Sequence, residues 1–95
     1  MVPDVSQISG IGPFTTKKDS GRELYFKESS VFLVVNPNTI EARCDQRLSD
    51  NLREKYESVM ESRYFGRGGI EIVPAGQLST EEIADLIRLS YNITE

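Results

Sequence analysis

The feature that most constrains this fold is a capped helix near the carboxyl end of the chain. Ser79 and Glu82 have the spacing of a capping box, in which each side chain accepts a hydrogen bond from the other residue's backbone N–H. Leu78 and Ile83 flank this box at the positions of a hydrophobic staple. The sequence therefore predicts a helix over residues 79–91. Its core-facing stripe consists of Ile83, Leu86, Ile87 and Tyr91.

This helix needs an apolar surface, and strand-like runs upstream predict a sheet. In residues 39–44, apolar Ile40, Ala42 and Cys44 alternate with polar residues, so they point inward while Thr39, Glu41 and Arg43 point outward. Short turns at 28–30 and 36–38 connect the first three runs and predict an antiparallel meander. The four predicted strands are residues 23–27, 31–35, 39–44 and 69–73.

A second helix is predicted between the third and fourth strands. Asp45 is its N-cap, and an apolar stripe at helical spacing continues as far as Met60. The glycine-rich run 66–69 then predicts a tight connection into the last strand. A phosphate-binding loop is the alternative, but such a loop follows a strand and opens a helix. The stripe consists of Leu48, Leu52, Tyr56, Val59 and Met60.

Residues 1–21 lack a long periodic pattern because proline, glycine and serine interrupt them. A short helical turn is predicted over residues 4–8, with Ile8, Ile11 and Phe14 anchoring the segment to the core. The predicted architecture is α+β: a four-stranded, mainly antiparallel sheet with two helices on one face and a short irregular N-terminal segment. We expect residues 1–21 to be that segment and residues 22–95 to be the domain.

Composition limits the classes of function. The chain has 95 residues and a net charge of −4, all of which arises after residue 67, so the basic residues before it could still form a local patch. No run approaches the roughly 20 apolar residues of a membrane span, and Met1–Asp4 does not resemble a signal peptide. The lone Cys44 suits a reducing interior, so we expect a cytoplasmic protein without a membrane partner.

The sequence offers little reactive chemistry. Histidine, the commonest general base and metal ligand, is absent. Cys44 falls on the inward face of its strand and is expected to be a small core residue. No carboxylate pair is set apart in an apolar run, and no acidic loop has calcium-binding spacing. We therefore expect a non-enzymatic protein that has no metal, no cofactor and no indicated small-molecule ligand.

A binding surface is predicted where arginine and tyrosine gather near the second helix and the glycine-rich run. Arginine beside an aromatic ring is typical both of nucleic-acid contacts and of protein interfaces. The alternative is that these arginines are solvated and paired with Glu41, Asp50 or Glu61. The candidate binding residues are Arg43, Arg47, Arg63, Tyr64 and Arg67.

The run from Leu78 to Tyr91 resembles the closing segment of the MmcQ/YjbR-like family, in which a strand, a turn and a helix ending in Ser-Tyr finish the domain. The paired strands at residues 25–32, the strand at 40–45 and the helix at 48–56 are similar to that family in order and spacing. The chain lacks the His and Trp that family members often carry before the penultimate strand, and has residues 63–69 there.

The resemblance implies a fold similar to the double wing of a phage transcription factor, which is often treated as DNA-binding. The leading hypothesis is thus a module that contacts duplex DNA or a transcription-associated protein through Arg43, Arg63 and Arg67. The second hypothesis is a protein-interaction domain, such as a small adaptor or inhibitor, that docks through its acidic last helix. Binding of a small ligand between sheet and helices is a third possibility, to which no residue specifically points.

Overall fold

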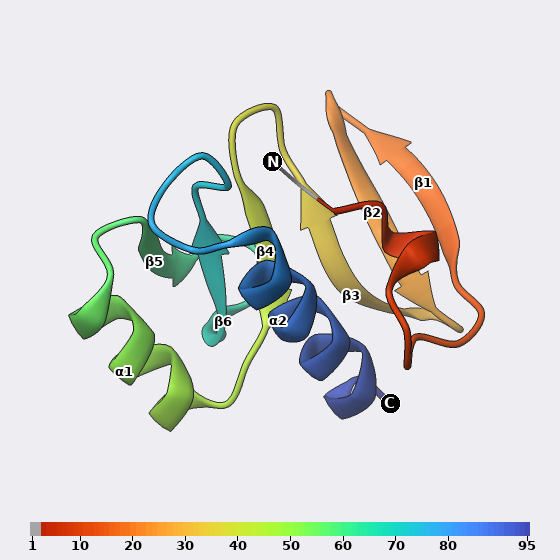
Figure 1. Ribbon diagram of the computed structural model, residues 1–95. Helices are drawn as coiled ribbons and strands as arrows, with labels where there is room; N and C mark the ends of the chain where they lie inside the picture. Colours follow the sequence, from red (N-terminus) through yellow and green to blue (C-terminus); the bar gives the residue numbers. More distant parts are fainter. Residues whose placement is uncertain (1–2) are drawn as a thin grey trace.

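The computed structural model describes residues 3–95, which form one antiparallel sheet with two helices packed on one face (Figure 1). The strand order in the sheet is β1-β2-β3-β4-β6-β5. The elements are η1 (Val5–Gln7), β1 (Thr15–Asp19), β2 (Arg22–Lys27), β3 (Ser30–Val35), β4 (Ile40–Arg43), α1 (Gln46–Lys55), β5 (Val59–Ser62), β6 (Gly66–Ile72) and α2 (Thr80–Ile93).

The predicted α+β class and the two helices on one face are observed, but the prediction of a four-stranded sheet is wrong, because the sheet has six strands. The first additional strand is β1, within the segment expected to be irregular. It is a polar edge strand paired with β2, and four of its five residues are exposed. Ser20 and Gly21 both have positive φ, which suits the two-residue hairpin that joins β1 to β2.

The second additional strand, β5, replaces the end of the predicted first helix. That helix, α1, ends at Lys55 because Tyr56 takes an extended backbone conformation while its N–H still bonds to the Leu52 carbonyl. Val59 and Met60 therefore belong to a strand. Val59 is buried in the observed strand, and the predicted helix would also have buried it. Its place in the apolar stripe therefore could not distinguish a helix from a strand.

The glycine-rich run 66–69 is correspondingly part of β6 and not a helix–strand connection. The tight turn lies at Arg63–Phe65, between β5 and β6. Glu61 pairs with Ile70 whereas the next residue, Ser62, pairs with Gly66. Residues 67–69 are thus extra residues that bulge out of this hairpin.

The central strands and the last helix follow the predictions. Strands β2, β3 and β4 form an antiparallel meander, and β6 pairs antiparallel with β4. The capping box is complete, because Glu82 N–H donates to Ser79 Oγ at 3.1 Å and Ser79 N–H donates to Glu82 Oε1 at 2.9 Å. Asp45 caps α1 as expected. The main core contains Ile40 and Ala42 of β4 and Cys44, which directly follows that strand, together with Leu78, Ile83, Ile87 and Tyr91.

The N-terminal segment packs beside α2 on the helical face. The predicted turn at residues 4–8 is observed as η1, capped by the Asp4 side chain, and Ile8 is buried. Two hydrogen bonds join the segment to α2. Arg88 Nε donates to the Ser9 carbonyl at 2.6 Å, and Tyr91 Oη donates to the Pro13 carbonyl at 2.9 Å.

A side chain of α2 completes the ladder between β3 and β4. The pairing between β2 and β3 is irregular at Phe32, where the register between these two strands shifts. Ser90, which is fully buried, spans the gap: its hydroxyl donates to the Phe32 carbonyl at 2.5 Å and accepts from Arg43 N–H at 2.7 Å. Two buried backbone groups of the sheet are therefore satisfied by one hydroxyl of the helix.

Candidate functional site

The sheet face turned away from the helices, which we call the outer face, has an apolar half and a polar half. Alternation along the strands places Leu24, Val31 and Val34 there, and they form a cluster separate from the main core. Phe26 and Phe65 pack against this cluster. The polar half begins at Glu41, which pairs with Val34 across β3 and β4.

Two buried carboxylates lie opposite each other in the polar half. Glu41 of β4 pairs directly with Glu71 of β6, and these residues are only 1% and 4% exposed. Like charges at this position destabilise a sheet unless other groups compensate them. Sequence patterning placed Glu41 on the outward side, which is correct, but the outer face there is covered by long side chains and not by water.

Each carboxylate has its own set of donors. Glu41 Oε1 accepts from Ser62 Oγ at 2.7 Å and from Tyr64 N–H at 2.8 Å, while Oε2 accepts from Asn36 Nδ2 at 2.9 Å. Glu71 accepts two hydrogen bonds from the Arg63 guanidinium, at 3.0 and 2.7 Å, and one from Thr39 Oγ1 at 2.6 Å. Glu71 therefore forms an ion pair, whereas Glu41 forms none with any group in residues 3–95.

These contacts change the pKa of the Glu71 carboxyl. Burial by itself raises the pKa of this carboxyl, but hydrogen bonds from Arg63 and Thr39 and the charge of Arg63 outweigh burial. The pKa of Glu71 is consequently below its usual value. A lowered pKa in the folded state stabilises the fold above the pKa of the unfolded chain, and this stabilisation disappears as pH falls through the folded-state value.

We expect Arg63→Gln to be less stable than the wild type at pH 7 and to lose less stability on acidification. The two free energies of unfolding should converge as pH falls from about 5, just above the ordinary pKa of Glu, toward 3. Urea denaturation at a series of pH values measures this. Arg67→Gln is the matched control, because Arg67 is exposed and should leave the pH profile unchanged. A difference in the free energy of unfolding between Arg63→Gln and wild type that stays constant with pH would contradict the lowered pKa of Glu71.

The β5–β6 turn carries two aromatic rings in contact with each other, and each ring lies next to a guanidinium. Tyr64 and Phe65 meet edge-to-face, with centroids 5.0 Å apart. The Arg22 guanidinium lies 5.2 Å from the Tyr64 centroid, and that of Arg43 lies 4.8 Å from the Phe65 centroid. Ser62 Oγ accepts from Phe65 N–H at 2.8 Å, so the Glu41–Ser62 pair fixes the backbone of this turn. Cation–π contacts thus join β2 and β4 to the β5–β6 turn.

The structure brings together part of the predicted set. Arg63 and Tyr64 lie in the turn, and Arg43 reaches it through Phe65. Arg43 also has a structural contact, since its Nε donates to the Val31 carbonyl at 2.7 Å. Arg67 is exposed in the bulge of β6.

Arg47 stands apart, exposed on the first turn of α1 in the helical layer. The alternative that the candidate arginines pair with Glu41, Asp50 or Glu61 is not observed for them. Arg63 pairs with Glu71, and Asp50 pairs with Arg53 instead.

Sequence reasoning missed Arg22, Asn36 and Glu71 at this site. A pocket of about 360 Å³ is lined by Arg22, Asn36, Glu41, Arg63 and Tyr64. The available signal was the Glu at the centre of both alternating runs, Ile-Glu-Ala and Ile-Glu-Ile. That signal becomes informative only when β4 and β6 are known to be neighbours, which brings the two Glu residues together.

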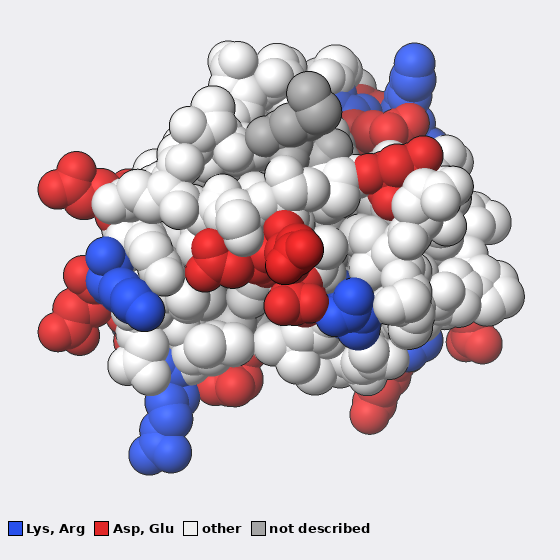
Figure 2. Space-filling view, in the orientation of Figure 1, with Lys and Arg blue, Asp and Glu red and all other residues white. Residues whose placement is uncertain are grey.

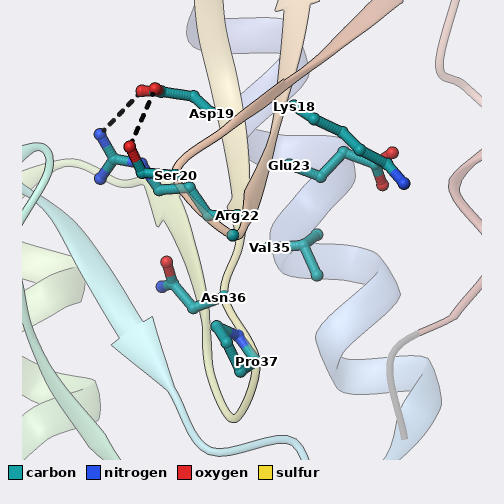
Figure 3. A pocket seen from close by; sticks show the side chains of 9 residues that line it. Lys18, Asp19, Ser20, Arg22, Glu23, Val35, Asn36 and Pro37 are labelled. Atoms are coloured by element: carbon teal, nitrogen blue, oxygen red, sulfur yellow. Dashed lines mark hydrogen bonds and ion pairs between the residues drawn. The ribbon is translucent and has the colours of Figure 1, made fainter.

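A larger hollow of about 480 Å³ lies at the tip of the β1–β2 hairpin, against the β3–β4 turn (Figure 3). It shares Arg22 and Asn36 with the pocket beside Glu41. Arg22 turns toward Asp19, with 3.4 Å between their charged groups, while Lys18 and Glu23 extend to the other side of the hairpin. Its charges are balanced and its side chains diverge, so this hollow has no convergent polar groups.

The remaining chemistry is sparse. Burial first, and the neighbouring Asp45 carboxylate second, raise the pKa of the Cys44 thiol to about 11, so little thiolate exists at neutral pH. Within residues 3–95, no group of three or more His, Cys, Asp or Glu is arranged to hold a metal ion. Neither helix in the described part of the chain has the length and apolar content to cross a bilayer.

Comparison with known proteins identifies a fold. No family model matches this chain, and no curated protein matches it in sequence. A crystal structure of the Deinococcus radiodurans protein DR2400, described by the family-model domain DUF419, superimposes with a TM-score of 0.73. The match covers 92% of this chain and 70% of that one at 14% identity. DUF419 is related to the MmcQ/YjbR family, so the resemblance expected from the sequence agrees with this neighbour at the level of fold.

Proposed function

We propose that this protein is a non-enzymatic module that contacts nucleic acid through the outer face of its sheet. The supporting observation is the row of guanidiniums against aromatic rings, Arg22 on Tyr64 and Arg43 on Phe65, on the sheet face opposite α1 and α2 (Figure 1). Arg63 adds a side chain that is 75% exposed. Guanidiniums contact phosphates and aromatic rings stack on bases, so this combination suits a nucleic acid.

The net charge of −4 does not oppose this proposal, because the acidic excess lies elsewhere. Figure 2, which views the helical face, shows acidic groups gathered over the first half of α2, where Glu81, Glu82 and Asp85 are exposed. On the outer face, Glu71 is buried and paired with Arg63. The Arg63 side chain is 75% exposed there, and Arg67 is exposed as well. A cytoplasmic location remains part of the proposal and suits the unpaired Cys44.

A salt titration of binding to a short DNA duplex tests this function. Affinity should fall steeply with salt, and Arg67→Ala should reduce the slope of log K against log salt by about one. Arg67 is the informative residue because it has no structural contact in the described chain, whereas Arg63→Ala also uncovers Glu71. Lys55→Ala, on α1, is the control and should leave the slope unchanged. Absence of binding to any nucleic acid at low salt would contradict the proposal.

A second candidate function uses the opposite face, where a groove of about 280 Å³ separates α1 from α2. Its apolar lining is Leu52, Tyr56, Leu78 and Leu86, and its charged lining is Glu82, Asp85 and Lys55. An apolar lining with a net acidic charge suits a protein segment that is apolar on one side and basic on the other. Binding of a leucine–lysine amphipathic peptide that Leu52→Glu abolishes, without any DNA binding, would favour this protein-interaction role.

A further inference from the structure

The pocket beside Glu41 lies where three parts of the chain converge. Arg22 comes from β2, Asn36 and Glu41 from the β3–β4 turn and β4, and Arg63 and Tyr64 from the β5–β6 turn. Its volume of about 360 Å³ is within the range of small-ligand sites, about 300–1,000 Å³. The polar atoms of its lining are largely fixed by hydrogen bonds within the protein.

The floor of this pocket presents unfilled acceptors. A carboxylate has about four acceptor positions, and Glu41 uses three, with one hydrogen bond on Oε2 against two on Oε1. Asn36 spends both amide hydrogens, one on Glu41 and one on Thr39 Oγ1 at 3.0 Å, and its Oδ1 accepts no hydrogen bond from residues 3–95. Glu41, although 99% buried, forms no ion pair within residues 3–95, and the Arg63 guanidinium, which pairs with Glu71, acts on it only through its charge. The floor therefore favours a ligand with N–H donors.

The walls restrict what kind of donor can enter. Tyr64 is 39% exposed, and its ring contacts the Arg22 guanidinium, which lies 5.2 Å from the ring centroid. Arg22 and Arg63 flank the opening, and a guanidinium has five N–H donors, of which Arg63 uses two on Glu71. These two guanidiniums, each of which also contacts one carboxylate (Asp19 and Glu71), favour a phosphate over a cationic amine. The fitting ligand is thus a neutral planar ring that carries an amino group and is attached to a phosphate.

We propose that this pocket takes one unpaired nucleobase of a single-stranded nucleic acid. Its exocyclic amino group would donate to Glu41, its face would stack on Tyr64 in place of the Arg22 guanidinium, and its phosphates would meet Arg22 and Arg63. A base within a duplex has its pairing edge occupied and its faces stacked, so it cannot enter. This inference rests on the proposed nucleic-acid contact through the outer face, and adds to it a preference for single strands and for amino-bearing bases.

Fluorescence anisotropy with equal-length single strands tests the inference. Oligo-deoxycytidine should bind at least about fivefold more tightly than an abasic strand with the same phosphates, because only a strand with bases can stack on the aromatic ring. Oligo-thymidine lacks an exocyclic amino group and should bind several-fold more weakly than oligo-deoxycytidine. Tyr64→Ala should bring oligo-deoxycytidine to the abasic level, and Tyr64→Phe, which keeps the ring, should restore most of the difference.

The outcomes of these measurements distinguish the proposed base-binding pocket from the proposed nucleic-acid contact through the outer face. Equal affinities for the abasic strand, both homopolymers and the duplex, all weakened by Arg67→Ala, would overturn the pocket and leave the outer-face function standing. Equal affinity for thymidine and deoxycytidine strands would overturn the role of Glu41. No binding of any strand at low salt would overturn both proposals. Because Tyr64 is an exposed turn residue, its variants should remain folded, and circular dichroism checks this.

Discussion

Ser90→Ala is expected to lower the free energy of unfolding by about 2–4 kcal/mol. The hydroxyl is fully buried and joins two strands that do not bond directly at this point, through Phe32 and Arg43. Alanine leaves one buried carbonyl and one buried N–H without partners, and each unsatisfied group costs about 1–3 kcal/mol. Urea denaturation followed by circular dichroism measures the loss.

Ser79→Ala is the matched comparison for Ser90→Ala, because it removes a hydroxyl from the same helix at an exposed position. Loss of the N-cap is expected to cost about 1 kcal/mol. A larger loss for Ser90→Ala than for Ser79→Ala therefore shows that the buried sheet contact stabilises the fold more than the exposed helix cap does. A Ser90→Ala variant no less stable than Ser79→Ala would show that water or a shifted backbone replaces the hydroxyl.

Gly69→Ala is expected to cost about 1–3 kcal/mol, the range for forcing extra volume into a packed site. A Cβ at this position would lie 2.7 Å from the Ala42 carbonyl oxygen and 2.6 Å from Phe65 Cβ. The first of these atoms is backbone of the adjacent strand β4, so relief requires moving a strand. Because Phe65 also supports Arg43, the substitution should also weaken nucleic-acid binding.

Gly68→Ala provides the control for Gly69→Ala. The nearest atom to a Cβ at Gly68 is the Phe65 carbonyl oxygen at 3.6 Å, an ordinary contact. Both changes add one methyl group to the same bulge, so a comparison of their thermal unfolding isolates the collision. Equal melting temperatures for the two variants would indicate that the Phe65 ring simply moves aside.

Much of the fold could be predicted because its central elements carry strong local patterns. Residues 39–44 alternate, and the capping box at Ser79 fixes the start of α2. The two missed strands lack such patterns. β1 is a polar edge strand that buries no apolar face, so only its backbone pairing with β2 defines it. In β5, Val59 suits a helical stripe as well as a strand, and its pairing with Ile72 decides the outcome.

The candidate site could be predicted only in part for a related reason. Arg63 and Tyr64 adjoin a glycine-rich run and are conspicuous in the sequence. Arg22 and Asn36 are distant in sequence and reach the site only because β2 and the β3–β4 turn lie beside it. Glu41 also has the pattern of an ordinary outward charge. Its burial depends on neighbours from β5 and the following turn, which the sequence assigned to a helix end.

The central claim is that the outer face of the sheet is the surface that binds. Mapping of backbone amide chemical shifts during titration with oligo-deoxycytidine at low salt tests this most directly. We predict that the perturbed amides belong to Arg22, Asn36 and residues 62–68, while those of α1 and α2 remain in place. Perturbations centred on the groove between Leu52 and Leu86, or none at any strand concentration, would contradict the account.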